Sequence, residues 1–302
     1  MAGSSNLARQ QVVTQKKQSK KEKIAVKTMK RLVKNKLALF GLIIIFVQII
    51  LAVFAPLFAP YDPIKQDLTN AELGIGAEGH WLGTDNYGRD VWSRLVFGAR
   101  ISLLVGIGSV SLGLIGGITL GLISGYFKKL DGIIMRLVDL LFAFPGILLA
   151  MLIIAMLGTS LVNVVIAISI WSIPTCARIV RGSVLSIKKQ EYIMAMKSLG
   201  ASNFRILVKH ILPNCTAPII VFATMRMATA ILSTAALSFL GLGAQPPTAE
   251  WGAMIAAGQV YMFTSPHLTI VPGIAIMLVV FAFNVVGDGL RDALDPNMDL
   301  DY

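Results

Sequence analysis

The chain has 302 residues, of which 55% are hydrophobic and only 14% are charged, and its mean hydropathy is +0.73. Soluble domains carry about 25% charged residues, so this composition excludes an ordinary soluble protein. The net charge of +11 does not indicate nucleic-acid binding, because eleven of the 27 basic residues lie within positions 1–36 and seven more within positions 178–209. Such clusters are typical of the cytoplasmic flanks of membrane helices.

The sequence predicts an all-α, multi-pass membrane protein with about six transmembrane helices. Residues 1–36 form a basic cytoplasmic tail, and the uncharged run 37–59 is long enough to be the first membrane helix. Residues 60–99 carry six acids and three bases, which predicts an extracytoplasmic loop with some local structure. Five further helices are expected within residues 100–290.

The next uncharged run, 101–127, contains a glycine at every fourth position from Gly113 to Gly125. This spacing puts a smooth groove on one helix face, which favours close packing on another helix of the same chain or on a second subunit. Residues 140–177 lack charge over 38 positions, which suits two spans joined by an outer turn at GTSLVN, 158–163.

A fifth span is expected at about 217–240 and a sixth at about 268–286, separated by an outer loop with a short interfacial or re-entrant helix. Residues 291–302 form an acidic cytoplasmic tail. Both termini are therefore predicted to lie in the cytoplasm, which places the basic block near residues 178–209 inside as well.

No nucleotide-binding, zinc-protease or serine-hydrolase motif occurs in the chain, and neither Cys176 nor Cys215 has a partner at metal-ligand spacing. We therefore expect a chain without enzymatic activity that binds no cofactor or metal itself. The two cysteines are expected to be small, apolar-facing residues.

A few ionisable residues fall at or near membrane depth, where they are costly and often functional. Arg136 and Asp139 are three apart on one helix face, so a local ion pair is expected between them. Arg226 lies in the fifth span, where it either lines a substrate pathway or extends its side chain to the inner interface. In the outer loop, three charged residues either contact another protein or hold the loop together: Asp85, Arg89 and Asp90.

The stretch 184–214 is amphipathic, basic and located on the cytoplasmic side of the predicted topology. Its apolar positions at Ile193, Met196, Leu199, Phe204, Leu207, Val208 and Ile211 follow helical spacing. Gly200 separates two short helical patterns and suits a tight turn, while Pro213 ends the second. The sequence predicts a helix–turn–helix hairpin that projects below the membrane.

The segment EYIMAMKSLGASNFRILVKHILPN resembles the cytoplasmic loop signature of ATP-binding cassette (ABC) importer permeases. Ala195, Gly200, Leu212 and Pro213 match that pattern, whereas its acidic position falls on Met194 and its second alanine on Met196. Two further segments, HWLGTDNYGRDVWSRLVFGARISL and LSFLGLGAQPPTAEWGAM, are similar to the dipeptide, oligopeptide and nickel branch. The basic tail and the single span before an outer loop look like the second, or C-type, permease of that branch.

The resemblance implies a type I importer permease in a bacterial cell membrane. Its expected partners are a homologous second permease, two cytoplasmic ATPases that use ATP and Mg²⁺, and an extracytoplasmic binding protein. The binding protein is the partner expected for Asp85, Arg89 and Asp90 in the first of their two roles. The hairpin would couple the chain to the ATPases, through Glu191, Ala195, Gly200, Ala201, His210, Leu212 and Pro213. We expect Gly200→Asp to leave membrane insertion intact and to abolish transport.

Several functions remain open at this level. The cargo of such a permease is a di- or oligopeptide, a glutathione-like peptide, nickel or a metal–chelator complex. A self-sufficient secondary carrier or channel is the alternative from a different class, although the internal repeats and intramembrane acids common in carriers are not visible.

Overall fold

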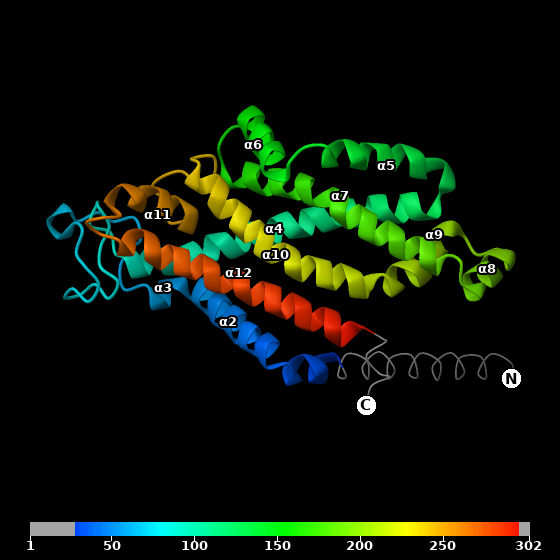
Figure 1. Cartoon of the computed structure of the whole chain (residues 1–302), viewed down its shortest axis with the longest axis horizontal. Helices are drawn as coiled ribbons and strands as arrows, with labels where there is room; N and C mark the ends of the chain where they lie inside the picture. The colour runs from blue at the N-terminus through cyan, green and yellow to red at the C-terminus, as the bar shows by residue number, and fades with distance from the viewer. Residues whose placement is uncertain (1–27, 296–302) are drawn as a thin grey trace, which may run out of the picture.

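The computed structural model describes residues 28–295, and apart from two isolated β-bridges every regular element in that range is helical. Helices lie side by side in an elongated bundle (Figure 1). These are α2 (Lys36–Val53), α4 (Val91–Tyr126), α5 (Lys128–Phe142), α7 (Leu161–Ile187), α10 (Thr216–Phe239) and α12 (His267–Leu294), and the shorter α6 (Gly146–Leu157) stands across them.

Five of the described helices are long and apolar enough to cross a membrane, namely α2, α4, α7, α10 and α12. The pair α5 and α6 also qualifies if it is counted as one span, although the two helices meet at an angle of 89°. The count of five or six agrees with the predicted number of membrane helices.

The predicted third span is therefore not a straight helix. It breaks at residues 143–145 because Pro145 has no N–H for helical hydrogen bonding and biases the residue before it away from helical geometry. Figure 1 shows α6 standing steeply against α5. The predicted turn at 158–163 is shorter in the structure, where residues 158–160 join α6 to α7 and residues 161–163 already belong to α7. Ser160 caps α7 by accepting a hydrogen bond from the backbone N–H of Asn163.

The predicted loop 60–99 ends earlier than expected, because α4 begins at Val91 rather than near residue 101. Asp90 caps this helix by accepting a 2.7 Å hydrogen bond from the backbone N–H of Ser93. The first span likewise ends at Val53 and continues as the short α3 (Ala55–Phe58), since Pro56 interrupts the hydrogen bonding of α2. Asn35 caps the start of α2.

Ion pairs hold α5 against α7, and they replace the expected pair of Arg136 with Asp139. Asp139 lies 2.6 Å from Arg178, and Asp131 accepts two hydrogen bonds from Arg181, at 2.6 and 2.7 Å. The prediction was wrong because α7 supplies arginines to the acidic residues of α5, which is a tertiary contact that helical spacing does not reveal.

The glycine face of α4 packs on α7 of the same chain, which confirms the intramolecular alternative. A Cβ atom at Gly113 would lie 2.8 Å from that of Ser172, and one at Gly117 would overlap that of Cys176. Gly121 and Gly125 meet Val180 and Val184 in the same way. The helices therefore approach more closely than any side chain on α4 would permit. Both Cys176 and Cys215 are buried among apolar residues, as expected.

Replacing Gly117 with alanine is expected to destabilise the α4–α7 contact by about 1–3 kcal/mol, because the new methyl group overlaps the Cys176 side chain. The matched control is Gly108→Ala on the same helix, where the nearest atom of Val165 is 3.4 Å away. Thermal unfolding of the two variants in detergent checks this. Equal midpoints would contradict the packing described here.

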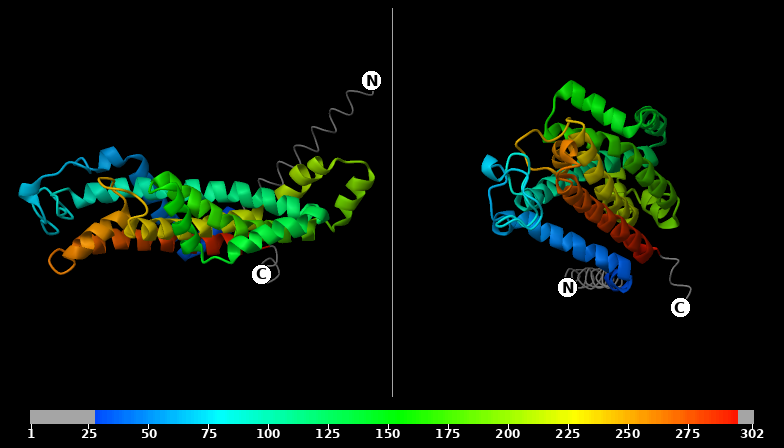
Figure 2. Two further views of the ribbon diagram at one scale, coloured as in Figure 1. Left: turned by 90° about the horizontal axis from the view of Figure 1, so that it is seen from above. Right: turned by 60° about the vertical axis from the view of Figure 1, so that its left-hand side comes forward.

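The short elements gather at the two ends of the bundle, as the side-on view in Figure 2 also shows. At the hairpin end lie α8 (Glu191–Ser198), α9 (Asn203–Ile206), a π-helical turn (Leu207–Ile211) and a 3₁₀ turn (Leu212–Asn214). At the opposite, loop end lie residues 59–90 with a 3₁₀ turn (Leu68–Asn70), α11 (Trp251–Gly258) and a 3₁₀ turn (Gln259–Tyr261).

The predicted terminal tails differ in extent from the structure. Helix α12 continues to Leu294, so the first residues of the predicted acidic tail 291–302 are helical. The predicted hairpin 184–214 also begins later, since α7 extends to Ile187. Most of the predicted basic tail 1–36 lies outside the described residues, as do residues 296–302.

Candidate functional site

The hairpin consists of two short helices joined by Gly200, as the sequence predicted. Gly200 has φ of +80°, a conformation that glycine adopts without strain, and the backbone N–H of Ala201 closes the turn on the carbonyl of Met196. Ser202 then starts α9 by accepting a hydrogen bond from the backbone N–H of Arg205. Pro213 lies in the 3₁₀ turn that ends the hairpin before α10.

One side of the hairpin is packed against the membrane helices. Ile193, Ile206 and Ile211 are buried with residues of α7 that include Val180 and Val184. Two polar contacts add to this packing. Tyr126 donates a 2.8 Å hydrogen bond to the Asn203 side chain, and Lys188 donates to the last carbonyls of α4, at 2.7 and 3.2 Å. The hairpin is thus fixed to the α4–α7 pair.

The other side of the hairpin presents large apolar side chains that are exposed. Leu199 is 86% exposed, Phe204 77% and Met194 54%. Ile193 and Ile211 of the predicted helical pattern are buried, whereas Leu199 and Phe204 of the same pattern are exposed, and the buried Ile206 lies outside the pattern. The turn at Gly200 reorients the chain, so the two short helices do not share one continuous register.

The residues expected to couple to an ATPase all lie on this hairpin. Glu191 and Ala195 are exposed on α8, Gly200 is exposed in the turn, and Ala201 packs on the buried cluster. His210, Leu212 and Pro213 lie in the last two turns. The structure brings them together as one projecting element. Their part in coupling stays a prediction.

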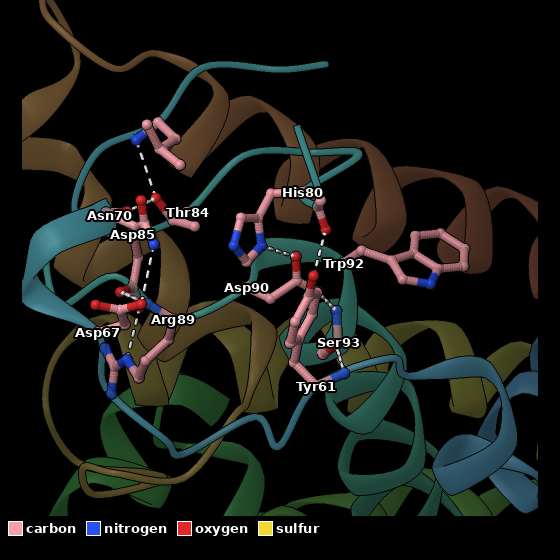
Figure 3. A network of polar contacts seen from close by, with 12 residues as sticks. Tyr61, Asp67, Asn70, His80, Thr84, Asp85, Arg89, Asp90, Trp92 and Ser93 are labelled. Carbon is pink, nitrogen blue, oxygen red and sulfur yellow. Dashed lines mark hydrogen bonds and ion pairs between the residues drawn. The ribbon is translucent and has the colours of Figure 1, made fainter. Parts of the chain in front are cut away.

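The loop end contains a compact network of buried polar groups, shown in Figure 3. Asp85 accepts hydrogen bonds from the backbone N–H groups of Tyr87 and Arg89 and from the Arg89 side chain, at 2.9, 3.0 and 2.7 Å. Arg94 approaches the same carboxylate at 3.5 Å. Asp90 joins His80, at 2.9 Å, to the start of α4. These groups fold the loop back onto α4.

Asp85, Arg89 and Asp90 are only 3–8% exposed, so they hold the loop together, which was one of the two expected roles. A contact of this loop with another protein stays a prediction, and it would involve exposed side chains such as Trp81 and Tyr87. His80 and Arg94 also belong to this network, and neither was predicted as a functional residue. Their position within one charged stretch, residues 80–94, was the available signal.

Helix α11 seals the loop end of the bundle. Trp251 is buried and donates a 2.9 Å hydrogen bond from its indole N–H to the carbonyl of Leu95. Glu250 is fully buried and caps α11 by accepting a hydrogen bond from the backbone N–H of Ala253. Burial raises the pKa of the Glu250 carboxyl above its ordinary value of 4.5, and hydrogen bonds to the carboxylate oppose part of that shift.

A raised carboxyl pKa means that the folded state holds this proton more tightly than the unfolded chain does. The contribution of Glu250 to stability is therefore present below pH 4.5 and is lost as the pH rises toward the folded pKa. We expect Glu250→Gln, which keeps an acceptor for the cap, to unfold at a higher temperature than the wild type at pH 8. At pH 4 the two proteins should unfold alike.

Thermal unfolding measured between pH 4 and pH 8 checks this expectation. Glu250→Ala serves as the control, because it removes the cap at every pH and should be about 1 kcal/mol less stable than Glu250→Gln throughout. A wild type that gains stability over Glu250→Gln as the pH rises would contradict the assignment.

Arg226 is the membrane-depth residue that lies in a cavity. Its guanidinium donates a 3.1 Å hydrogen bond from Nε to the Ser172 hydroxyl and stacks over the Trp171 ring at 4.5 Å. The side chain is held at mid-helix on α7 rather than extended along α10 toward the interface. The cavity has a volume of about 530 Å³ and is lined by Ile179, Ala217, Pro218, Val221, Phe222, Met225, Arg226, Thr229, Arg291, Leu294 and Asp295.

Comparisons with known proteins agree with this architecture. Residues 117–300 match the family model described as binding-protein-dependent transport system inner membrane component, and residues 26–74 match the N-terminal TM domain of oligopeptide transport permease C. Among solved structures, an inward-facing methionine ABC transporter has a TM-score of 0.55 at 20% identity, covering 67% of this chain and 97% of that chain. That likeness concerns the fold alone.

Two relatives extend over most of the chain. The dipeptide transport system permease protein DppC of Alkalihalophilus pseudofirmus is 51% identical over 89% of this chain and 88% of its own length. The glutathione transport system permease protein GsiD of Escherichia coli is 48% identical, with 89% of each chain covered. Proteins of this family are multi-pass inner membrane permeases that work with ATPase and substrate-binding subunits. The chain belongs to this family of ABC importer permeases, as a C-type permease of the peptide and nickel branch.

Proposed function

We propose that this chain carries short peptides inward as one of two permeases of an ATP-driven importer. The observation that supports peptides as cargo is its 51% identity, over 89% of its length, to a dipeptide permease. A second candidate cargo is glutathione, itself a short peptide, because a glutathione permease is 48% identical over the same share of the chain. Nickel and metal–chelator complexes are the remaining alternatives within this branch.

The proposed assembly contains a homologous second permease, two cytoplasmic ATPases and an extracytoplasmic binding protein. Both termini and the hairpin lie in the cytoplasm in this arrangement, and ATP and Mg²⁺ are bound by the ATPases. The exposed apolar side chains of the hairpin, Leu199, Phe204 and Met194, support a docked partner, since such groups seldom remain in water. Attachment of the hairpin to α4 and α7 provides the path from ATPase closure to the membrane helices.

The test is purification of the tagged chain from its own membrane in mild detergent, followed by mass spectrometry of the bound proteins. We expect two ATPase subunits and a second permease. Reconstitution with the binding protein should then give uptake that needs ATP and survives collapse of the proton gradient. Uptake that needs the gradient instead would establish the rival secondary carrier.

Competition experiments on the isolated binding protein separate the cargo candidates. Dipeptides, glutathione and nickel are each offered against a labelled dipeptide. Displacement by dipeptides at the lowest concentration supports the proposal, and displacement by glutathione or nickel alone replaces it with the corresponding alternative.

A further inference from the structure

The depth of Arg226 is the first observation behind a further inference. Helix α10 starts at Thr216, and at a rise of 1.5 Å per residue Arg226 lies about 15 Å along it. This distance is half the thickness of a bilayer core of about 30 Å. A positive charge at that depth is costly unless it faces a partner or a polar pathway. Its position therefore needs an explanation in the surrounding structure.

The neighbours of Arg226 orient its side chain without neutralising it. Ser172 engages Nε and Trp171 lies against the face of the guanidinium, whereas Nη2 is buried and has no hydrogen-bond partner. Among residues 28–295, Arg226 forms no ion pair with a carboxylate. Ser172 thus holds the Nε end of the guanidinium, and Nη2 is a buried, unsatisfied donor that an acceptor on a ligand entering beside it would satisfy.

The cavity beside Arg226 runs along one stripe of α10. Ala217, Val221, Met225 and Thr229 recur at helical spacing, so the stripe extends for about 18 Å from the hairpin end to mid-membrane depth. Its lining is mostly apolar, and Arg226 is the charged residue at the deep end. The other charged lining residues belong to the last turn of α12 and the residue that follows it.

We propose that Arg226 receives a carboxylate of the cargo as the cargo passes mid-membrane, an inference that rests on the peptide function proposed above. Every peptide with a free C-terminus carries this group, and arginine donates strong, charge-assisted hydrogen bonds to it. Because Ser172 occupies Nε, a cargo carboxylate is left with the two Nη groups as donors. The contact favours an anionic end, and transport requires that the same contact also release it.

The experiment uses proteoliposomes that contain the complete importer and saturating loaded binding protein. Import of a labelled dipeptide is compared with import of its C-terminal amide, each at a concentration that saturates the binding protein. The ratio of the two rates is taken within each variant, so a general loss of assembly cancels. The wild type should import the free acid about tenfold faster than the amide.

In Arg226→Gln the ratio should fall close to one, because the amide side chain of glutamine has no charge to offer the carboxylate. Arg226→Lys keeps the charge and should retain most of the preference for the free acid. If the glutamine variant assembles poorly, the ratio measured in the lysine variant still tests the role of the charge. Arg136→Gln is the matched control, since Arg136 lies exposed on α5 and outside the cavity. Its ratio should equal that of the wild type.

An unchanged ratio in Arg226→Gln, or an equal fall in Arg136→Gln, would overturn this role for Arg226 while leaving peptide import standing. A wild type that imports neither peptide with ATP would instead remove the proposed function itself. The two failures are therefore distinguishable in one series of measurements.

Discussion

Gly200→Val is expected to leave the chain in the membrane and to abolish ATP-driven uptake. At φ of +80° a β-branched side chain is strained by about 1–3 kcal/mol, so the turn between α8 and α9 must rearrange. No atom lies within 4 Å of a Cβ built at this glycine, so the cost arises from the backbone conformation and the membrane helices remain undisturbed. The measurements are the amount of chain in the membrane fraction and the uptake by reconstituted importer.

Two further variants separate strain from charge at the same position. Asparagine tolerates positive φ better than other residues with a side chain, so Gly200→Asn should keep much of the uptake. Aspartate shares that tolerance and adds a negative charge to the exposed turn, so the loss expected in Gly200→Asp would arise at the docking surface. Normal uptake by Gly200→Val would remove the hairpin from the coupling mechanism.

Asp85→Ala is expected to unfold the loop end, at a cost of about 3–5 kcal/mol. The substitution leaves Arg89 and Arg94 buried without their shared carboxylate. Removing one partner of a buried ion pair is strongly destabilising because the remaining charge is buried and unpaired. It also removes the acceptor for two backbone N–H groups of the turn. Protease cleavage within residues 60–90 and the thermal unfolding midpoint measure the effect.

The control for this variant is Asp67→Ala in the same loop. Asp67 is exposed and caps only the 3₁₀ turn at Leu68–Asn70, so its loss should cost about 1 kcal/mol or less. Equal sensitivity of the two variants to protease would show that the buried network around Asp85 does not stabilise the loop.

The membrane helices were predictable because hydrophobic length is a strong signal in a chain of this composition. The boundaries of the fifth span and the short helix after it were also close to the structure, since Pro213 and the Gly- and Pro-bearing loop mark them. The glycine face of α4 was assigned correctly because close approach leaves a regular spacing in the sequence. These features depend on local sequence alone.

The features that were missed depend on contacts between distant segments. Asp131 and Asp139 pair with arginines of α7, about 40–50 positions away along the chain, and no spacing rule identifies such partners. The bend before α6 was hidden because a single Phe-Pro-Gly does not distinguish a kinked span from a broken one. Arg226 was recognised as unusual, but its orientation required Trp171 and Ser172 to be located.

The length of α4 has a mechanical consequence. Its 36 residues extend for about 54 Å, well beyond a bilayer core of about 30 Å, and it is packed along its glycine face against α7. One end carries the hairpin contacts of Tyr126, and the other begins at the folded loop around Asp90. A rotation of this rigid pair by about 10° would displace its far end by about 9 Å. Small angular changes at one membrane face thus become large displacements at the other.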